Sequence, residues 1–118
     1  MDIKIQKEQV EAAAASKDLQ TVHSIVALNF HIDKDKVAKL YQEIGVDYKE
    51  RIIDPVIQES VKAVTAIFTA EELVTKREIV KEDIKNLLKE KLPVRGINID
   101  EFNIVNFEFS KNFNEAIE

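Results

Sequence analysis

The pattern of hydrophobic and polar positions changes its period twice along the chain. Between residues 20 and 32 apolar and polar positions alternate, and many residues are β-branched, which predicts a half-buried strand. Residues 3–15 also alternate, and Ser16-Lys17-Asp18 between the two runs is typical of a turn. The pattern therefore predicts an antiparallel hairpin over residues 3–32.

Within residues 3–15 the apolar residues move from odd-numbered to even-numbered positions. Ile3 and Ile5 share one parity, whereas Val10, Ala12 and Ala14 share the other. A parity change of this kind predicts a bulge or bend near residues 7–9.

A period near 3.6 follows the hairpin. Asp33 is placed to cap a short amphipathic helix that ends before Gly45. The segment 47–68 predicts a second helical stretch, interrupted where Asp54 is able to cap and Pro55 suits the first helical position. The apolar stripe expected on this stretch comprises Val56, Ile57, Ser60, Val61, Val64, Ile67 and Phe68.

A third helix is predicted from a capping box. Thr69 and Glu72 have the spacing at which a hydroxyl and a carboxylate satisfy each other's free backbone donors. The helix that they open runs to about Leu92 and ends at Pro93 and Gly96. Its expected apolar side comprises Leu73, Val80, Ile84, Leu87, Leu88 and Leu92.

The last part of the chain returns to strand chemistry. Residues 97–109 predict a strand with a bend near Asp100-Glu101, and Phe113, Ala116 and Ile117 have the spacing of a helix start. Strands, helices, a strand and a helix start predict an α+β fold, with an antiparallel or mixed sheet and helices on one face. Without a linker or repeat, residues 1–118 are expected to form one domain.

Composition narrows the functional classes. The chain has 118 residues, 45% hydrophobic and 33% charged, so a packed core is possible without metals or disulfides. Its net charge of −5 is mixed along the chain, and no Lys/Arg block suits a phosphate backbone. The longest apolar runs are too short to span a bilayer. The absence of cysteine excludes disulfides, thiolate nucleophiles and cysteine zinc sites.

The remaining candidates for chemistry have simpler interpretations. His23 and His31 lie on one strand face, separated by roughly 26 Å, and cannot share a metal unaided. Ser16 and Lys17 stand side by side on a tight turn, where neighbours rarely aim at each other as nucleophile and base. The chain has two glycines and no phosphate-cradling loop. No catalytic, cofactor or metal site is predicted.

The aromatic residues near the C-terminus have two interpretations. The cluster Phe102, Phe107, Phe109 and Phe113 is expected either in the core or partly as an exposed apolar patch for a partner. The candidate partner interface comprises Phe102, Phe113 and Ile117.

Four segments together resemble one family, the prohibitin-type SPFH (band 7) domains. Residues 15–22 resemble its hairpin, and residues 40–51 its helix-to-helix junction. Residues 68–78 are similar to its most recognisable segment, and residues 104–118 to its closing strand and the entry to a C-terminal helix. The segments occur in family order over nearly the whole chain.

The resemblance implies a non-enzymatic scaffold domain of a membrane-associated protein. Such proteins assemble into large homo- or hetero-oligomers, organise membrane proteins and lipids, and modulate membrane-bound AAA proteases. Family members usually carry a membrane anchor before this domain and a coiled coil after it, so the chain is expected to be a soluble fragment that lacks both. The alternatives are a membrane-surface lipid-binding module without rings and, with less support, a hydrolase. No nucleic acid, small-molecule substrate or cofactor is expected.

Overall fold

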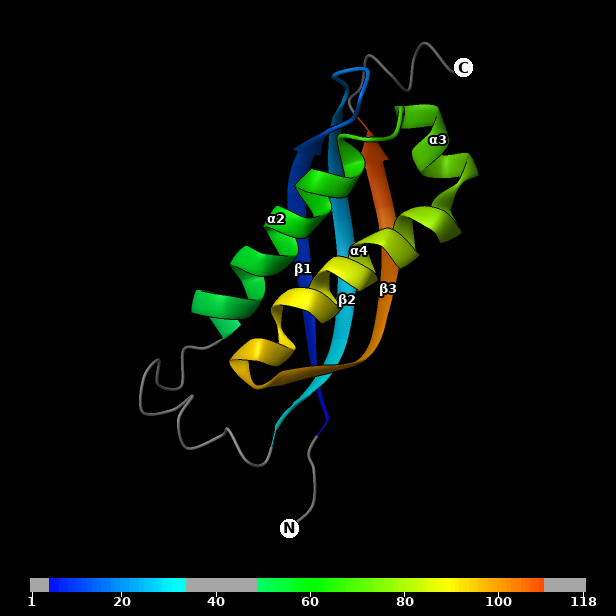
Figure 1. Cartoon of the computed structure of the whole chain (residues 1–118). Coiled ribbons are helices and arrows are strands. Elements are labelled where there is room, and N and C mark those ends of the chain that lie inside the picture. The colour runs from blue at the N-terminus through cyan, green and yellow to red at the C-terminus, as the bar shows by residue number, and fades with distance from the viewer. Residues whose placement is uncertain (1–4, 34–48, 110–118) are drawn as a thin grey trace.

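The computed structural model describes residues 5–33 and 49–109. Three antiparallel strands form one sheet in the order β1-β2-β3, and the helices cover one of its faces (Figure 1). This arrangement confirms the predicted α+β class. The elements are β1 (Gln6–Ala15), β2 (Thr21–Ile32), one π-helical turn (Lys49–Ile53), α2 (Asp54–Thr65), α3 (Ala70–Thr75), α4 (Arg77–Lys91), one 3-10 turn (Pro93–Arg95) and β3 (Ile97–Phe109).

The predicted hairpin is confirmed, but the bulge predicted near residues 7–9 is wrong. Strands β1 and β2 pair without a register shift from Gln6 opposite Phe30 to Ala15 opposite Thr21. Ile5 is 60% exposed. It is therefore an apolar residue that faces outward, and its odd position does not indicate a change of register.

Strand β3 contains two register shifts against β2. Asp100 is the extra residue of the first shift, between the partners of Asn29 and Phe30, and this confirms the bend predicted there. Val105 is the extra residue of the second shift. Each shift returns the following apolar side chains to the helix-covered face, because successive strand residues point to opposite faces.

Helix α2 begins without the predicted cap. Pro55 stands in its first turn as expected, but Ile53 before the helix already has helical dihedral angles (φ −65°, ψ −54°). Because the π-helical turn runs directly into α2, no free helix end exists for Asp54 to cap, and that prediction is wrong. The helix predicted after Asp33 falls on residues outside the described ranges.

The capping box at Thr69 is confirmed, but the helix that it opens is shorter than predicted. Helix α3 ends at Thr75, and Lys76 (φ −111°, ψ 32°) separates it from α4. At the far end, Gly96 adopts φ 86° after Pro93, which ends the helical region as expected.

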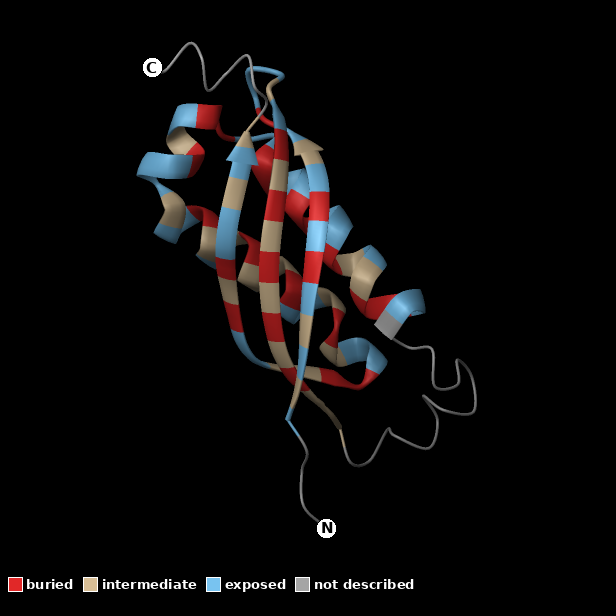
Figure 2. Cartoon of the chain, turned by 180° about the vertical axis from the view of Figure 1, so that it is seen from behind, coloured by how far each residue is buried: buried red, intermediate tan, exposed pale blue. Residues whose placement is uncertain are grey.

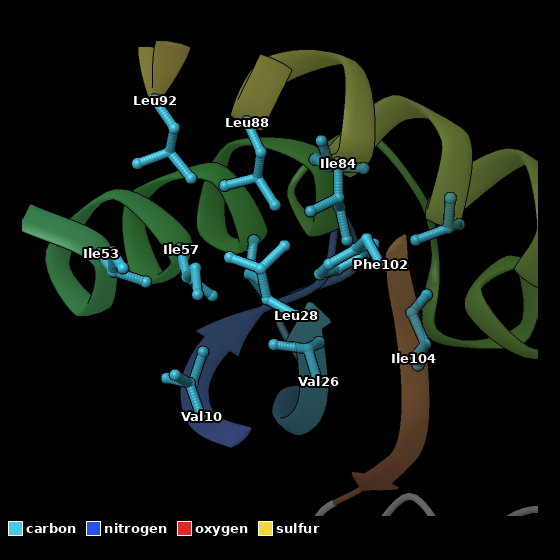
Figure 3. Close-up of a cluster of buried hydrophobic side chains, with 14 of the residues drawn as sticks. Val10, Val26, Leu28, Ile53, Ile57, Ile84, Leu88, Leu92, Phe102 and Ile104 are labelled. Carbon is cyan, nitrogen blue, oxygen red and sulfur yellow. The ribbon is translucent and has the colours of Figure 1, made fainter. Parts of the chain in front are cut away.

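The core fills the layer between the sheet and the helices (Figure 3). Along β2 every second residue from Val22 to Phe30 is buried, and Figure 2 shows this alternation from the open side of the sheet. Most of the predicted helix stripes are buried, but Ile67 is 62% exposed, and Val56 and Leu87 are only partly buried. The core side chains labelled in the close-up are Val10, Val26, Leu28, Ile53, Ile57, Ile84, Leu88, Leu92, Phe102 and Ile104.

Candidate functional site

The hairpin turn, which the sequence singled out, is held by several hydrogen bonds. Its backbone closes on itself through Ser16 N to Gln20 O (3.0 Å) and Leu19 N to Ser16 O (2.9 Å). It is also tied to the α2–α3 junction, because Lys17 N donates to Phe68 O at 2.7 Å. The turn is therefore held against a segment some 50 residues further along the chain.

Asp18 provides the side-chain part of this attachment. Its Oδ1 accepts hydrogen bonds from the Ser16 hydroxyl and, at 3.1 Å, from the backbone N–H of Ala70. The hydrogen bond from Ser16, helped by that from Ala70, lowers the pKa of the Asp18 carboxyl from its ordinary value of 3.8. We call the contact of Ser16, Asp18 and Ala70 the turn clamp.

The capping box lies directly beside the turn clamp. Glu72 N donates to Thr69 Oγ1 (3.2 Å), and Thr69 N donates to Glu72 Oε1 (3.0 Å). Lys76 Nζ donates to the other carboxylate oxygen at 3.1 Å. The Thr69 backbone hydrogen bond and then the Lys76 contact lower the pKa of Glu72 from its ordinary value of 4.5.

Ser16 has the structural role that the turn pattern predicted. Its side chain is buried, and its hydroxyl donates to Asp18 while accepting from Gln20 N at 3.0 Å. A nucleophile needs an accessible hydroxyl within reach of a base. The geometry at Ser16 provides turn closure instead.

The two histidines occupy separate places on the open face of the sheet. His23 Nδ1 lies 3.4 Å from a Glu11 carboxylate oxygen, and His31 Nδ1 lies 2.9 Å from both carboxylate oxygens of Asp100. Asp100 is the extra residue of the first β3 bulge, so the bulge aims its side chain at His31. Within residues 5–33 and 49–109, no three His, Cys, Asp or Glu side chains are grouped so as to hold a metal.

The second bulge is held by a side chain from the helical layer. Arg77 Nη2 donates to the carbonyl oxygens of Ile104 and, at 3.2 Å, Val105. The Arg77 guanidinium also lies 6.0 Å from the centre of the Phe107 ring, a cation–π distance. Arg77 thus links the start of α4 to the outer edge of the sheet.

The open face carries a shallow groove that sequence reasoning missed. It has a volume of about 500 Å³ and crosses all three strands. No helix covers this side of the sheet in the described part of the chain (Figure 2). Polar side chains around the small Ala27 form the groove, which is lined by Lys7, Glu8, Gln9, Ala27, Asn29, Glu101 and Asn103.

Of the three residues predicted as a partner interface, the structure describes Phe102. Phe102 is fully buried, so of the two interpretations given for the aromatic cluster the core one holds for this residue. Phe107 and Phe109 pack partly buried against the core, with ring centres 6.3 Å apart. Phe113 and Ile117 lie outside the described residues, so their interface role remains a prediction.

Two of the exposed apolar side chains lie near the hairpin turn, while others, such as Val94 (73% exposed), lie elsewhere. Leu19 is 84% exposed and has φ 64°, the left-handed region that is uncommon for a bulky residue. Ile67, next to the Phe68 carbonyl that the turn binds, is 62% exposed. Among the helices that the structure describes, none is both long and apolar enough to cross a membrane.

Comparison with known proteins gives one consistent family. The model of the SPFH domain / Band 7 family matches residues 1–118. The Mitochondrial prohibitin complex protein 1 of Caenorhabditis elegans is 33% identical over 99% of this chain and 42% of its own length. Prohibitin-1, mitochondrial, of Arabidopsis thaliana is 32% identical over 99% of this chain and 41% of its own length. Prohibitin 1 of Mus musculus is 32% identical over 99% and 43%, respectively. The chain therefore spans about two fifths of the length of these relatives.

Proposed function

Because the chain belongs to the SPFH domain / Band 7 family, we propose that it works as a non-enzymatic scaffold domain of a membrane-associated, prohibitin-like protein. The protein assembles into large oligomers that organise membrane proteins and lipids and modulate membrane-bound AAA proteases. The observation that carries the proposal is the match to prohibitins over 99% of the chain.

The side-chain chemistry is consistent with a function in binding. The turn clamp uses the polar groups of Ser16 and Asp18 in hydrogen bonds within the fold. The capping box does the same with those of Thr69 and Glu72. The name of the Caenorhabditis elegans relative describes a protein of a complex. An uncovered sheet face and the exposed side chains of Leu19 and Ile67 near the hairpin turn support a role in contacts between subunits.

The test uses the full-length protein in its native membrane. After gentle detergent extraction, native electrophoresis and electron microscopy measure the size of its assemblies. The expected result is a large complex that co-purifies with a membrane-bound AAA protease, whose cleavage of membrane substrates changes when the complex is removed. A monomer that binds lipid vesicles would support the lipid-binding alternative and overturn the scaffold.

A further inference from the structure

The two edges of the sheet differ in how open they are to pairing. Strands β1 and β3 form the edges, and β2 lies between them (Figure 1). Strand β3 contains two bulges, and Arg77 donates to the carbonyl oxygens of Ile104 and Val105. Bulges and covering side chains protect an edge from pairing with another strand. Strand β1 pairs with β2 over ten residues without a register shift, and in the described part of the chain no strand pairs with its other side.

The hydrogen bonds of the hairpin show which backbone groups of β1 point outward. Ser16 N donates to Gln20 O at 3.0 Å, and the register that sets Ala15 opposite Thr21 sets these two residues opposite each other. Hydrogen-bonded and non-hydrogen-bonded pairs alternate along an antiparallel ladder. The even-numbered residues of β1 therefore bond to β2, and the N–H and C=O groups of the odd-numbered residues point away from it. Ala15 O agrees with this, because it accepts a hydrogen bond from the Thr65 hydroxyl of α2 at 3.5 Å.

The outward groups of β1 form a row that suits a further strand. They belong to Lys7, Gln9, Glu11 and Ala13, whose side chains are all exposed. A row of N–H and C=O groups at a sheet edge is a template for pairing with another chain. The carbonyl of Ala15 is already bound to α2, so the stretch that can pair ends at Ala13.

The charges on this stretch are self-complementary. When two copies of β1 pair antiparallel about a two-fold axis at Gln9, Lys7 of each copy lies opposite Glu11 of the other. All these residues are odd-numbered, so the outward backbone groups of the two copies meet as well. An axis at Lys7 or at Glu11 would set like charges opposite each other, and an axis at residue 8 or 10 would leave both charges without an opposite charge. The sequence of β1 therefore favours one register of pairing with a second copy.

The side chains on this stretch are available for the contact. The Glu11 carboxylate lies 3.4 Å from His23 Nδ1, but the side chain is 63% exposed and its oxygens accept further hydrogen bonds. Lys7 and Gln9 line the groove on the open face at its β1 side. An amide both donates and accepts, so Gln9 on the axis is able to bond to Gln9 of the second copy.

We propose that two copies of the protein pair through β1, antiparallel and with Gln9 on the two-fold axis. The inference rests on the proposed function, because it names one contact between subunits of the assembly. The axis is perpendicular to the sheet, so the strands of both copies form one continuous sheet with both helical layers on the same side. Strand pairing alone buries a small area, so the dimer is weak by itself and becomes effective when other contacts hold the copies together.

Two other occupants fit the β1 edge less well. Strand β3 of a second copy is bulged and held by Arg77, and a β1–β3 contact would be head-to-tail and would continue into filaments. An extended peptide of another protein would use the same backbone groups. The two-fold arrangement of Lys7 and Glu11, however, matches a second β1.

The first experiment uses the absence of cysteine from the chain, because a single introduced thiol then reports which residues meet. Gln9→Cys places its thiol opposite that of the second copy, at a Cα separation of about 5.5 Å. A short thiol-to-thiol cross-linker should join Gln9→Cys chains about tenfold faster than Ala13→Cys chains, because Ala13 lies opposite residue 5 of the second copy. Both residues are exposed on the same face of β1, so their accessibility is matched. Equal rates for the two variants would overturn the proposal.

The second experiment tests the charge pairs by sedimentation of the 118-residue chain at up to about 1 mM, where a millimolar Kd is still detected. Lys7→Glu or Glu11→Lys alone sets two like-charged pairs in the dimer and should weaken association about tenfold or more. An equimolar mixture of the two variants should recover association, since every pair then joins opposite charges. Lys89→Glu, at an exposed residue of α4, makes the same change of net charge and should leave association unchanged. Circular dichroism confirms that each variant is folded.

Four results of sedimentation would each overturn the proposal. They are a monomer at the highest concentration, an unchanged dimer in either single charge variant, no recovery in the mixture, and growth beyond the dimer. A further test cross-links full-length Gln9→Cys protein in its native membrane. A product that joins it to a different protein and not to its own copy would assign the β1 edge to another partner and also overturn the proposal.

Failure of this inference is distinguishable from failure of the proposed function. If the 118-residue chain does not pair and full-length Lys7→Glu protein still forms large complexes, the scaffold stands without this contact. If the unchanged full-length protein forms no complex, the scaffold itself is wrong.

Discussion

The carboxylate of Asp18 accepts a hydrogen bond from the backbone N–H of Ala70, although 52 residues separate them. The contact joins the β1–β2 turn to the first residue of α3 and so fixes one end of the sheet to the helical layer. It also positions the exposed Leu19 next along the turn. Several of the expected properties of the domain depend on this contact.

Acid should lower the unfolding free energy partly by protonating Asp18 in the turn clamp and Glu72 in the capping box. The pKa values of Asp18 and Glu72 are lowered by folding, so near their ordinary values of 3.8 and 4.5 the unfolded chain binds more protons. Their contribution to stability is complete above about pH 5 and is lost as the pH falls through the lowered folded-state pKa values. Urea titrations between about pH 6 and 3 should show Asp18→Asn with a flatter decline than the unchanged protein. Glu90→Gln on α4 controls for the loss of one carboxylate, and an equally flat decline there would contradict the prediction.

The capping box should have a measurable and local effect. Thr69→Ala removes the side-chain acceptor for Glu72 N and should lower the unfolding free energy by about 1 kcal/mol. Thr75→Ala is the matched control, because Thr75 is exposed and its hydroxyl bonds only within α3. That change should stay within about 0.5 kcal/mol. If urea titration gave the same loss of unfolding free energy for Thr69→Ala and Thr75→Ala, the cap would not stabilise α3.

Burial on α4 and in the α2–α3 junction should decide the cost of truncating apolar side chains. Leu88 is fully buried, so Leu88→Ala should cost roughly 2–5 kcal/mol by loss of contacts and cavity formation. Leu87 packs only partly against the core and should cost less, while exposed Ile67→Ala should cost under about 0.5 kcal/mol. Chemical denaturation that ranks Ile67 with Leu88 would show that the side chain of Ile67, in the α2–α3 junction, is buried and not exposed.

Local patterns predicted the elements of this fold better than their junctions. The alternation from Val22 to Phe30 and the parity change at Asp100 predict a strand and a bulge because both reflect the two faces of a sheet. The break at Lys76 was missed because Leu73 and Val80 are seven residues apart, which fits an unbroken helix equally well.

The contacts that join the hairpin turn to the helical layer depend on tertiary structure and had no local signal. The Asp18–Ala70 bond joins two turns distant in sequence, and each turn alone was explained by its own chemistry. Phe102 was assigned to either core or surface because an aromatic residue suits both, and only packing against the helices decides between them. Exposure of Leu19 and its positive φ likewise depend on how the hairpin closes.

Ser16 supplies the sharpest test of the absence of catalysis. Its hydroxyl closes the turn by donating to Asp18 and accepting from Gln20 N, and its side chain is buried. Ser16→Ala should therefore lower stability, because it removes a partner of the turn clamp and leaves Gln20 N without that acceptor. The purified chain should show no turnover of peptides, esters or phosphate esters with either residue at this position. Circular dichroism confirms that the variant is folded, and an activity that disappears in folded Ser16→Ala would contradict the scaffold. An activity that persists unchanged in the variant would point to a contaminating hydrolase, because substitution of Ser16 would not affect a foreign enzyme.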